Sequence, residues 1–226
     1  MGGGKSMTKL RENQCLQPHN FQGEFFQEMR WGNIFKYKDF ERANFEKNIL
    51  QELKNHSIWT YEHSLNTEKL ALEIGRYLFL SDEQLDILAA AARLHDIGKL
   101  SVPLKILNKE GSLTVDERSI INRHAEHGFT TLKESRLYPM EVCIAVREHH
   151  LPYPRMTRPS MITEILQAAD CAEAMLSERP YKPARTAEDV ANEFIMEAGE
   201  RYRAEIAVAT ADVLEHFYGR GERYAV

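Results

Sequence analysis

Histidine and aspartate side chains interrupt the apolar stretches of this 226-residue sequence at positions where they could bind metal. Six of the nine histidines fall between residues 63 and 150, and two acidic breaks lie among alanines and leucines. The candidate ligands are His63, His95, Asp96, His124, His149, His150 and Asp170. Imidazole and carboxylate are ligands that zinc, iron, manganese, nickel and cobalt accept. Because a buried carboxylate without a partner is costly, the pattern favours a metal centre.

The set is large enough for two divalent ions, provided that Asp96 bridges them and water completes the coordination. Two ions about 3.5 to 4 Å apart lower the pKa of a shared water and clamp the oxygens of a phosphoryl group. The chemistry predicted is phosphoester hydrolysis by a metal-activated hydroxide. A lone histidine is more often a core or surface residue, and we interpret His19, His56 and His216 in this way.

Helices must position these ligands. From about residue 46 onward, apolar residues recur at spacings of three and four, and no strand alternation of useful length appears. Two reciprocal capping patterns mark helix starts, "SDEQ" at residues 81–84 and "TVDE" at residues 114–117. We expect His95 and Asp96 to end the helix that starts at Ser81. We expect His63 to lie on the helix preceding "TEKLALEIGRYLFL", and His124 to lie near the end of the helix capped at Thr114.

The sequence therefore predicts an all-α fold, a helical bundle with a divergent N-terminal extension. We place the extension, partly disordered, at residues 1–45 and the helical domain at residues 46–226. The extension is rich in aromatic residues. We expect it to pack on the domain or to mediate formation of a homodimer.

The composition excludes several classes of protein. Hydrophobic residues make up 43% and charged residues 28%, and no apolar run approaches the length of roughly 20 residues that a membrane helix needs. A formal net charge of −5 gives no basic excess for binding long nucleic acids. The three cysteines form no C-x-x-C pair, which argues against a zinc ribbon or a disulfide framework and favours the cytoplasm.

The ordered ligand set resembles the HD superfamily of metal-dependent phosphohydrolases, and specifically its HD-GYP branch of cyclic-di-GMP phosphodiesterases. The likeness covers roughly residues 60 to 217 and includes the flanking segments "LHDIGKLSVPLKILNKEGSLTVDE", "HAEHG" and "AADCAEAMLSERPYKPA". The resemblance implies one metal held by His63, His95, Asp96 and Asp170, and another held by Asp96, His124, His149 and His150. It also implies that Lys99 faces the scissile phosphate or the bridging hydroxide, and that Arg179 and Lys182 bind a substrate phosphate. His127 has no counterpart, and we interpret it as a residue behind the ligands or at the surface.

The chain departs from the branch at three places. Its segment "HHLPYPRMTRPS" lacks the glycines of the branch's Gly-Tyr-Pro loop, with Arg158 where the tyrosine should precede Pro159. The interval from His150 to Asp170 is shorter than in the branch by about eight residues. Trp59 stands where some members place a glutamate that helps to bind a third metal, so we expect two metals.

Three functions remain open at this point. The leading hypothesis is a two-metal phosphodiesterase acting on a cyclic dinucleotide similar to cyclic di-GMP. The first alternative is a nucleotide or phosphomonoester hydrolase of the wider superfamily. The second is a signalling module that binds its ligand without catalysis. The metal itself stays open between iron, manganese, nickel, cobalt and zinc.

Overall fold

The structure is a computed structural model and describes residues 21–151, 159–178 and 183–218, with side chains described from residue 39. The chain divides into two compact units, Met1–Phe40 and Glu41–Val226. The helix α1 (Phe21–His56) runs through the boundary between these units. The predicted domain boundary between residues 45 and 46 also falls within α1 and stays a prediction.

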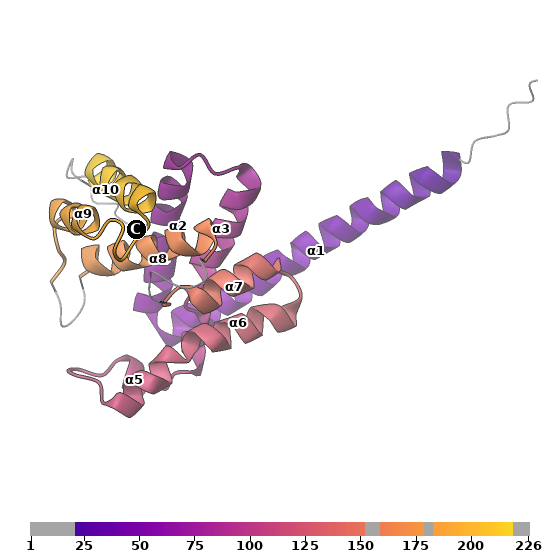
Figure 1. Cartoon of the computed structure of the whole chain (residues 1–226). Coiled ribbons are helices and arrows are strands. Elements are labelled where there is room, and N and C mark those ends of the chain that lie inside the picture. Colours follow the sequence, from indigo (N-terminus) through magenta and orange to yellow (C-terminus); the bar gives the residue numbers. More distant parts are fainter. Residues whose placement is uncertain (1–20, 152–158, 179–182, 219–226) are drawn as a thin grey trace, which may run out of the picture. The chain divides into compact units, whose positions relative to one another are not determined.

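The predicted all-α fold is confirmed (Figure 1). In the described ranges, the only bridge between extended residues is an isolated one between Ala198 and Tyr202. After α1 the elements are α2 (Ile58–Tyr77), α3 (Asp82–Leu94), the 3-10 helix η1 (Ile97–Ser101), α4 (Leu104–Leu107), α5 (Val115–Asn122), α6 (His124–Ser135), α7 (Met140–Glu148), α8 (Met161–Leu176), α9 (Ala187–Met196) and α10 (Ala204–Tyr218). No helix in this described part of the chain has the length and apolar character needed to cross a membrane.

Both predicted capping boxes are present. The Ser81 hydroxyl accepts from the Gln84 backbone N–H at the start of α3, and Thr114 does the same for Glu117 at the start of α5. In each pair the N3 side chain also accepts from the backbone N–H of the capping residue, so free amides at the helix start are satisfied. These two local signals were sufficient to locate the starts of two helices that carry or precede ligands.

Two expected helix boundaries are wrong. No separate helix precedes "TEKLALEIGRYLFL": His63 and most of this segment lie on the same helix, α2. The reason is that α2 starts after the Ser57 cap and no proline or glycine interrupts it before Gly75. His124 does not end the helix capped at Thr114. That helix, α5, ends at Asn122, and His124 begins α6 after a one-residue turn at Arg123.

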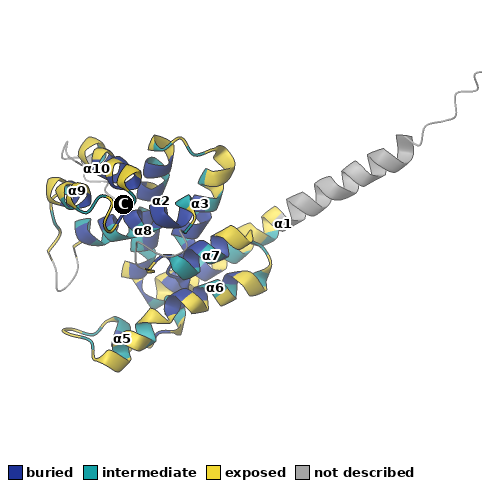
Figure 2. Ribbon diagram, viewed as in Figure 1, coloured by how far each residue is buried: buried dark blue, intermediate teal, exposed yellow. Residues whose placement is uncertain are grey.

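The core lies where α2, α3 and α8 pack together (Figure 2). Ile74, Leu88 and Leu166 are fully buried there. The alanines at positions 90–92 are also buried, and their small side chains let neighbouring helices come close. Helix α3 packs against α2, α7 and α8, so its C-terminal end reaches the interior of the unit. A polar side chain at that end is consequently removed from solvent.

A glycine permits the close approach of η1 to α6. A Cβ atom at Gly98 would lie 1.9 Å from the carbonyl oxygen of His124 and 2.7 Å from the backbone nitrogen of Gly128. No side chain fits at this separation, since nonbonded atoms in proteins do not approach so closely. Gly98 therefore allows the segment that follows Asp96 to lie directly against the helix that begins with His124.

Candidate metal centre

Asp96 lies at the centre of the predicted ligand set and is 1% exposed. Its Oδ1 is 3.3 Å from Nε2 of His124, and its Oδ2 is 3.4 Å from Nε2 of His95 and 3.7 Å from Nε2 of His63. Lys99, one turn further along η1, places Nζ 2.6 Å from Oδ2. One carboxylate thus faces imidazoles from three different helix segments, the arrangement that a bridging ligand requires.

Three of the histidines are oriented by their own backbone. Nδ1 of His95 lies 2.8 Å from the carbonyl oxygen of Ala92. His124 and His149 repeat the contact, at 2.7 Å to the carbonyl of Ile121 and 2.6 Å to that of Val146. A carbonyl oxygen only accepts, so each Nδ1 carries the proton and each Nε2 presents a lone pair to the interior. This is the tautomer that binds a metal through Nε2.

His63 is oriented by a side-chain carboxylate on α8 and not by a backbone carbonyl. Its Nδ1 donates to Oε2 of Glu173, and its Nε2 lies 2.9 Å from Oδ1 of Asp170. Glu173 is itself held by the Ser177 hydroxyl and by the Asn66 amide at 3.5 Å. Sequence reasoning missed Glu173, although a second acidic residue three positions after Asp170, in an apolar helix, was an available signal.

Asp170 joins the two sides of the cluster. Its Oδ1 is 3.7 Å from Nε2 of His95, and its Oδ2 is 3.8 Å from Nδ1 of His150. The His150 ring lies against that of His149, with centroids 3.9 Å apart and the planes tilted by 43°, but the His150 side chain is 51% exposed. His150 therefore lies where the cluster meets solvent, whereas His95, His124 and His149 are buried.

The structure brings all seven predicted ligands into one place. Within the described residues, three groups have ligand atoms within 4.8 Å of one another: His63 with His95 and Asp96, His95 with His149 and Asp170, and His124 with His149 and His150. The groups share members, as expected if neighbouring ions share ligands. The division of the ligands between two metals stays a prediction.

The ligand atoms do not satisfy one another by hydrogen bonds, and a cation would satisfy them better. Among the described residues, Nε2 of His95 and Oδ1 of Asp96 are buried without a hydrogen-bond partner. Nε2 of His124 faces Nε2 of His149 at 3.3 Å, yet both rings carry their proton on Nδ1. Lone pairs that face each other in a buried site repel, and a buried acceptor without a donor costs free energy. A cation between these atoms removes both penalties.

Electrostatics favour the same conclusion. Burial lowers the pKa of His124 to about 4 and depresses that of His149, so both rings are neutral at pH 7. Although burial opposes ionisation of Asp96, the ammonium of Lys99 holds its pKa well below the usual range. Burial also opposes protonation of His63, but hydrogen bonds to Asp170 and Glu173 outweigh it and raise the pKa to about 9. Without metal, His63 thus binds a proton where it would otherwise bind a cation.

The remaining predicted residues have mixed outcomes. Lys99 is at the cluster and its side chain is 20% exposed, so it reaches both Asp96 and solvent. Arg179, Lys182 and the segment 152–158, which contains Arg158, lie outside the described residues. Trp59 is 58% exposed on α2, one turn before His63. His127 lies at the surface, where its Nδ1 contacts the Ser101 hydroxyl.

Comparison with known proteins shows which family shares these features. The family model described as the HD domain matches residues 60–175. A cyclic di-GMP phosphodiesterase from Thermotoga maritima is 31% identical over 184 residues, which cover 77% of this chain and 50% of the relative. The cyclic di-GMP phosphodiesterase response regulator RpfG from Xanthomonas campestris is 36% identical over 50% of this chain and 32% of the relative. A 3'3'-cGAMP-specific phosphodiesterase from Vibrio cholerae is 29% identical over 68% of this chain and 30% of the relative.

Solved structures share the fold. The HD domain of the phosphodiesterase PgpH from L. monocytogenes, in complex with cyclic-di-AMP, matches with a TM-score of 0.56 at 17% identity, over 76% of this chain and 97% of that one. An HDG"Y"P protein from Bdellovibrio bacteriovorus matches with a TM-score of 0.57 at 16% identity, over 80% and 60%. The chain spans 30% to 50% of the length of the three curated relatives described above.

Proposed function

The chain belongs to the HD domain family, and on that premise we propose that it is a metal-dependent phosphohydrolase that cleaves a phosphodiester bond of a cyclic dinucleotide. The single observation that carries the proposal is the convergence of buried, correctly oriented Nε2 atoms on Asp96. The family match and the curated relatives named for cyclic di-GMP or 3'3'-cGAMP support the substrate class. The catalytic unit that we propose comprises residues 46–226.

We propose two divalent ions. One would be held by His63, His95, Asp96 and Asp170, and the other by Asp96, His124, His149 and His150. Bound there, such ions would lower the pKa of a water molecule and offset negative charge on phosphoryl oxygens. Asp96 is suited to the shared position because its two oxygens face different histidines. Of the metals that accept this ligand set, none is preferred by the residues alone.

The chain's own cations would orient the substrate. Lys99 is a partly exposed ammonium beside Asp96, and it can donate to a phosphate oxygen that approaches from the solvent side. Arg179 and Lys182 are proposed to bind the second phosphate of the cyclic dinucleotide. His150 lines the open side of the cluster, so the substrate would enter past its ring.

The proposal is tested with Asp96→Asn, which keeps the shape of the side chain and removes its charge. We expect the variant to lose bound metal and to lose hydrolysis of cyclic dinucleotides, because the shared ligand no longer neutralises the cations. Metal content of the purified protein and product formation, with manganese or ferrous iron supplied, are the measurements. Asp86→Asn is the matched control, since Asp86 is an exposed aspartate on α3, the helix that ends just before His95 and Asp96.

The outcomes separate the open functions. Retained metal and turnover in Asp96→Asn contradict the assignment of the site. Turnover of mononucleotides in preference to cyclic dinucleotides by the unmodified protein would favour the phosphomonoester alternative. Metal content well below one ion per chain, with binding of cyclic dinucleotide but no turnover, would favour a signalling module.

A further inference from the structure

Gln167 on α8 holds the turn that carries two of the predicted metal ligands. Its Nε2 lies 3.0 Å from the backbone carbonyl oxygen of Glu148 and 2.8 Å from that of Leu151. Carbonyl oxygens only accept, so the NH₂ group of the side chain donates to both. Glu148 ends α7, and His149 and His150 come directly after it. Gln167 therefore bonds the turn on both sides of this histidine pair.

The sequence explains why this turn needs a donor from another part of the chain. In a continuing α-helix the carbonyl oxygen of Glu148 would accept from the backbone N–H four residues later, but that residue is Pro152, which has no N–H. The turn itself is closed by a backbone hydrogen bond of 3.0 Å from Leu151 to Glu148. Beyond such bonds, the last carbonyls of a helix depend on side chains or water. Gln167 supplies a side-chain donor from a different helix.

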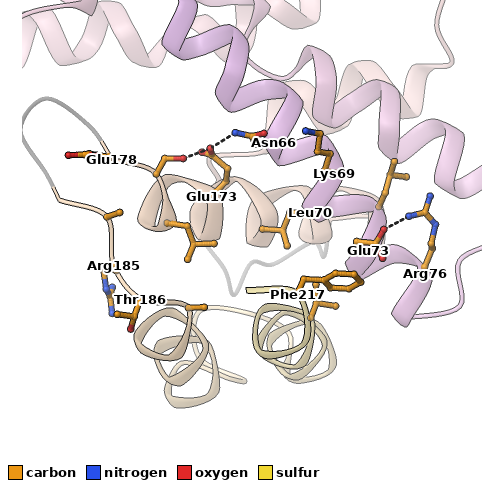
Figure 3. Close-up of a pocket in the computed structure, with 16 residues that line it drawn as sticks. Asn66, Lys69, Leu70, Glu73, Arg76, Glu173, Glu178, Arg185, Thr186 and Phe217 are labelled. Atoms are coloured by element: carbon orange, nitrogen blue, oxygen red, sulfur yellow. Dashed lines mark hydrogen bonds and ion pairs between the residues drawn. The ribbon is translucent and has the colours of Figure 1, made fainter. Parts of the chain in front are cut away.

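Gln167 is also one of three polar residues that follow one side of α8. Gln167, Asp170 and Glu173 are three residues apart, and residues at this spacing are neighbours on a helix surface. Glu173 orients His63 through Nδ1. Figure 3 shows this carboxylate at the wall of a cavity, with the Asn66 amide directed at it from α2. The predicted ligand Asp170 thus has a supporting residue one turn away on each side, Glu173 toward α2 and Gln167 toward α7.

The hydrogen bonds of Gln167 fix the end of α7 relative to Asp170. Both residues belong to α8, so these bonds set how far the end of α7 lies from the Asp170 carboxylate. Nδ1 of His150 is 3.8 Å from Oδ2 of Asp170, and the His149 ring lies against the His150 ring. Metal–ligand bond lengths vary by only about 0.2 Å. A shift of the end of α7 would consequently take both rings out of bonding distance of an ion.

We propose that Gln167 is a positioning residue of the metal centre, which holds the end of α7 so that His149 and His150 reach their ion. The inference rests on the proposed two-metal site and deepens it, because it gives each half of the site its own support on α8. Loss of Gln167 should weaken binding of the ion held by His149 and His150. Loss of the Glu173 charge should instead weaken binding of the ion held by His63. Outer partners of metal ligands change metal affinity by about 10- to 100-fold.

The first experiment tests these hydrogen bonds in the metal-free, full-length protein. Gln167→Met keeps the approximate length of the side chain but has no N–H to donate. We expect backbone amide exchange of Leu151 to accelerate about fivefold or more, the effect of about one hydrogen bond, and the ring resonances of His149 to shift. The ring resonances of His63 should not move, because Glu173 and not Gln167 holds that ring.

Gln51→Met is the matched control. Gln51 is exposed on α1, and its Nε2 donates at 3.0 Å to the side chain of Asn55 within the same helix. The control thus loses a side-chain hydrogen bond of the same kind. It should leave amide exchange of Leu151 and the ring resonances of His149 unchanged.

The second experiment compares the two halves of the site. Metal-free protein is titrated with Zn²⁺ at buffered free concentrations, and the ring resonances of the individual histidines report where the ion binds. In Gln167→Met we expect the response of His149 to need about tenfold more free Zn²⁺, with the response of His63 unchanged within about twofold. Glu173→Gln should show the opposite pattern, a weakened response of His63 and a retained response of His149.

Either of two results would overturn this role for Gln167. One is a Zn²⁺ response of His149 that is the same in Gln167→Met and in the unmodified protein. The other is an equal loss of response at His149 and His63, which would show that Gln167 supports the fold in general. Failure of the proposed function is seen elsewhere, as missing metal or missing turnover in the unmodified protein. The readouts for Gln167 involve no substrate, so the two failures are distinguishable.

Discussion

Substitution of Glu173 by glutamine isolates the charge that the carboxylate contributes at His63. Glutamine keeps the length of the side chain and an oxygen that can accept from Nδ1 of His63, but it is neutral. In the metal-free protein, Asp170 and Glu173 together overcome burial and raise the pKa of His63 from 6.5 to about 9. At 1.36 kcal/mol per pKa unit this difference corresponds to roughly 3 kcal/mol.

This is the net value after burial has offset part of what the two carboxylates contribute, so if they contribute equally, loss of one charge removes at least about 1.5 kcal/mol, or about tenfold in an equilibrium constant. The same interaction makes the ring a better electron donor toward a metal, and changes to such supporting carboxylates weaken metal binding by about 10- to 100-fold. We therefore expect Glu173→Gln to bind Mn²⁺ about tenfold more weakly, with less change in the overall fold than a substitution of His63 itself would cause.

Metal titration of the purified variant measures this effect, and histidine proton resonances measure the pKa of His63 in metal-free protein. Glu62→Gln is the control, because Glu62 neighbours His63 in sequence but points about 100° away on an α-helix. Unchanged Mn²⁺ affinity in Glu173→Gln, or an equal loss in Glu62→Gln, would refute the reasoning. A His63 pKa that stays near 9 in the variant would show that Asp170 alone sets it.

Three further perturbations follow from the same geometry. Gly98→Ala would force η1 away from α6, since the new Cβ would lie 1.9 Å from the His124 carbonyl oxygen. We expect the free energy of unfolding to fall by about 1 to 3 kcal/mol and metal binding to weaken, as measured by denaturant titration and metal content. The metal-free protein should lose stability with rising pH, because the folded pKa of His63 is above its unfolded value. The stabilisation is fully present below pH 6.5 and is lost as the pH rises through about 9, while Mn²⁺ affinity rises over the same interval. Thermal melts in chelator at several pH values check the sign. Ser57→Ala removes the helix cap of α2, the hydroxyl that accepts from the Thr60 backbone N–H. The free energy of unfolding should fall by about 1 kcal/mol, with no change in the metal bound by the folded protein, as melting curves and metal analysis would show.

The sequence alone determined the helical class, two helix starts and the candidate ligands. These were accessible because their signals are local. Capping pairs lie three residues apart, and a charged or imidazole side chain in an apolar stripe is costly wherever the helix packs. Asp96 could be identified in this way without knowledge of its neighbours.

Tertiary structure decided how those residues meet. The hydrogen bond by which Glu173 orients His63 connects α8 to α2, and the two residues lie 110 positions apart in the sequence. No local sequence pattern indicates such a pairing. The close approach at Gly98 likewise depends on which helix packs against η1. Helix boundaries at His63 and His124 were misjudged because caps and turns with weak local signals decide them. Ligand identity follows from the cost of burying each residue, whereas ligand geometry follows from long-range packing that sequence spacing does not specify.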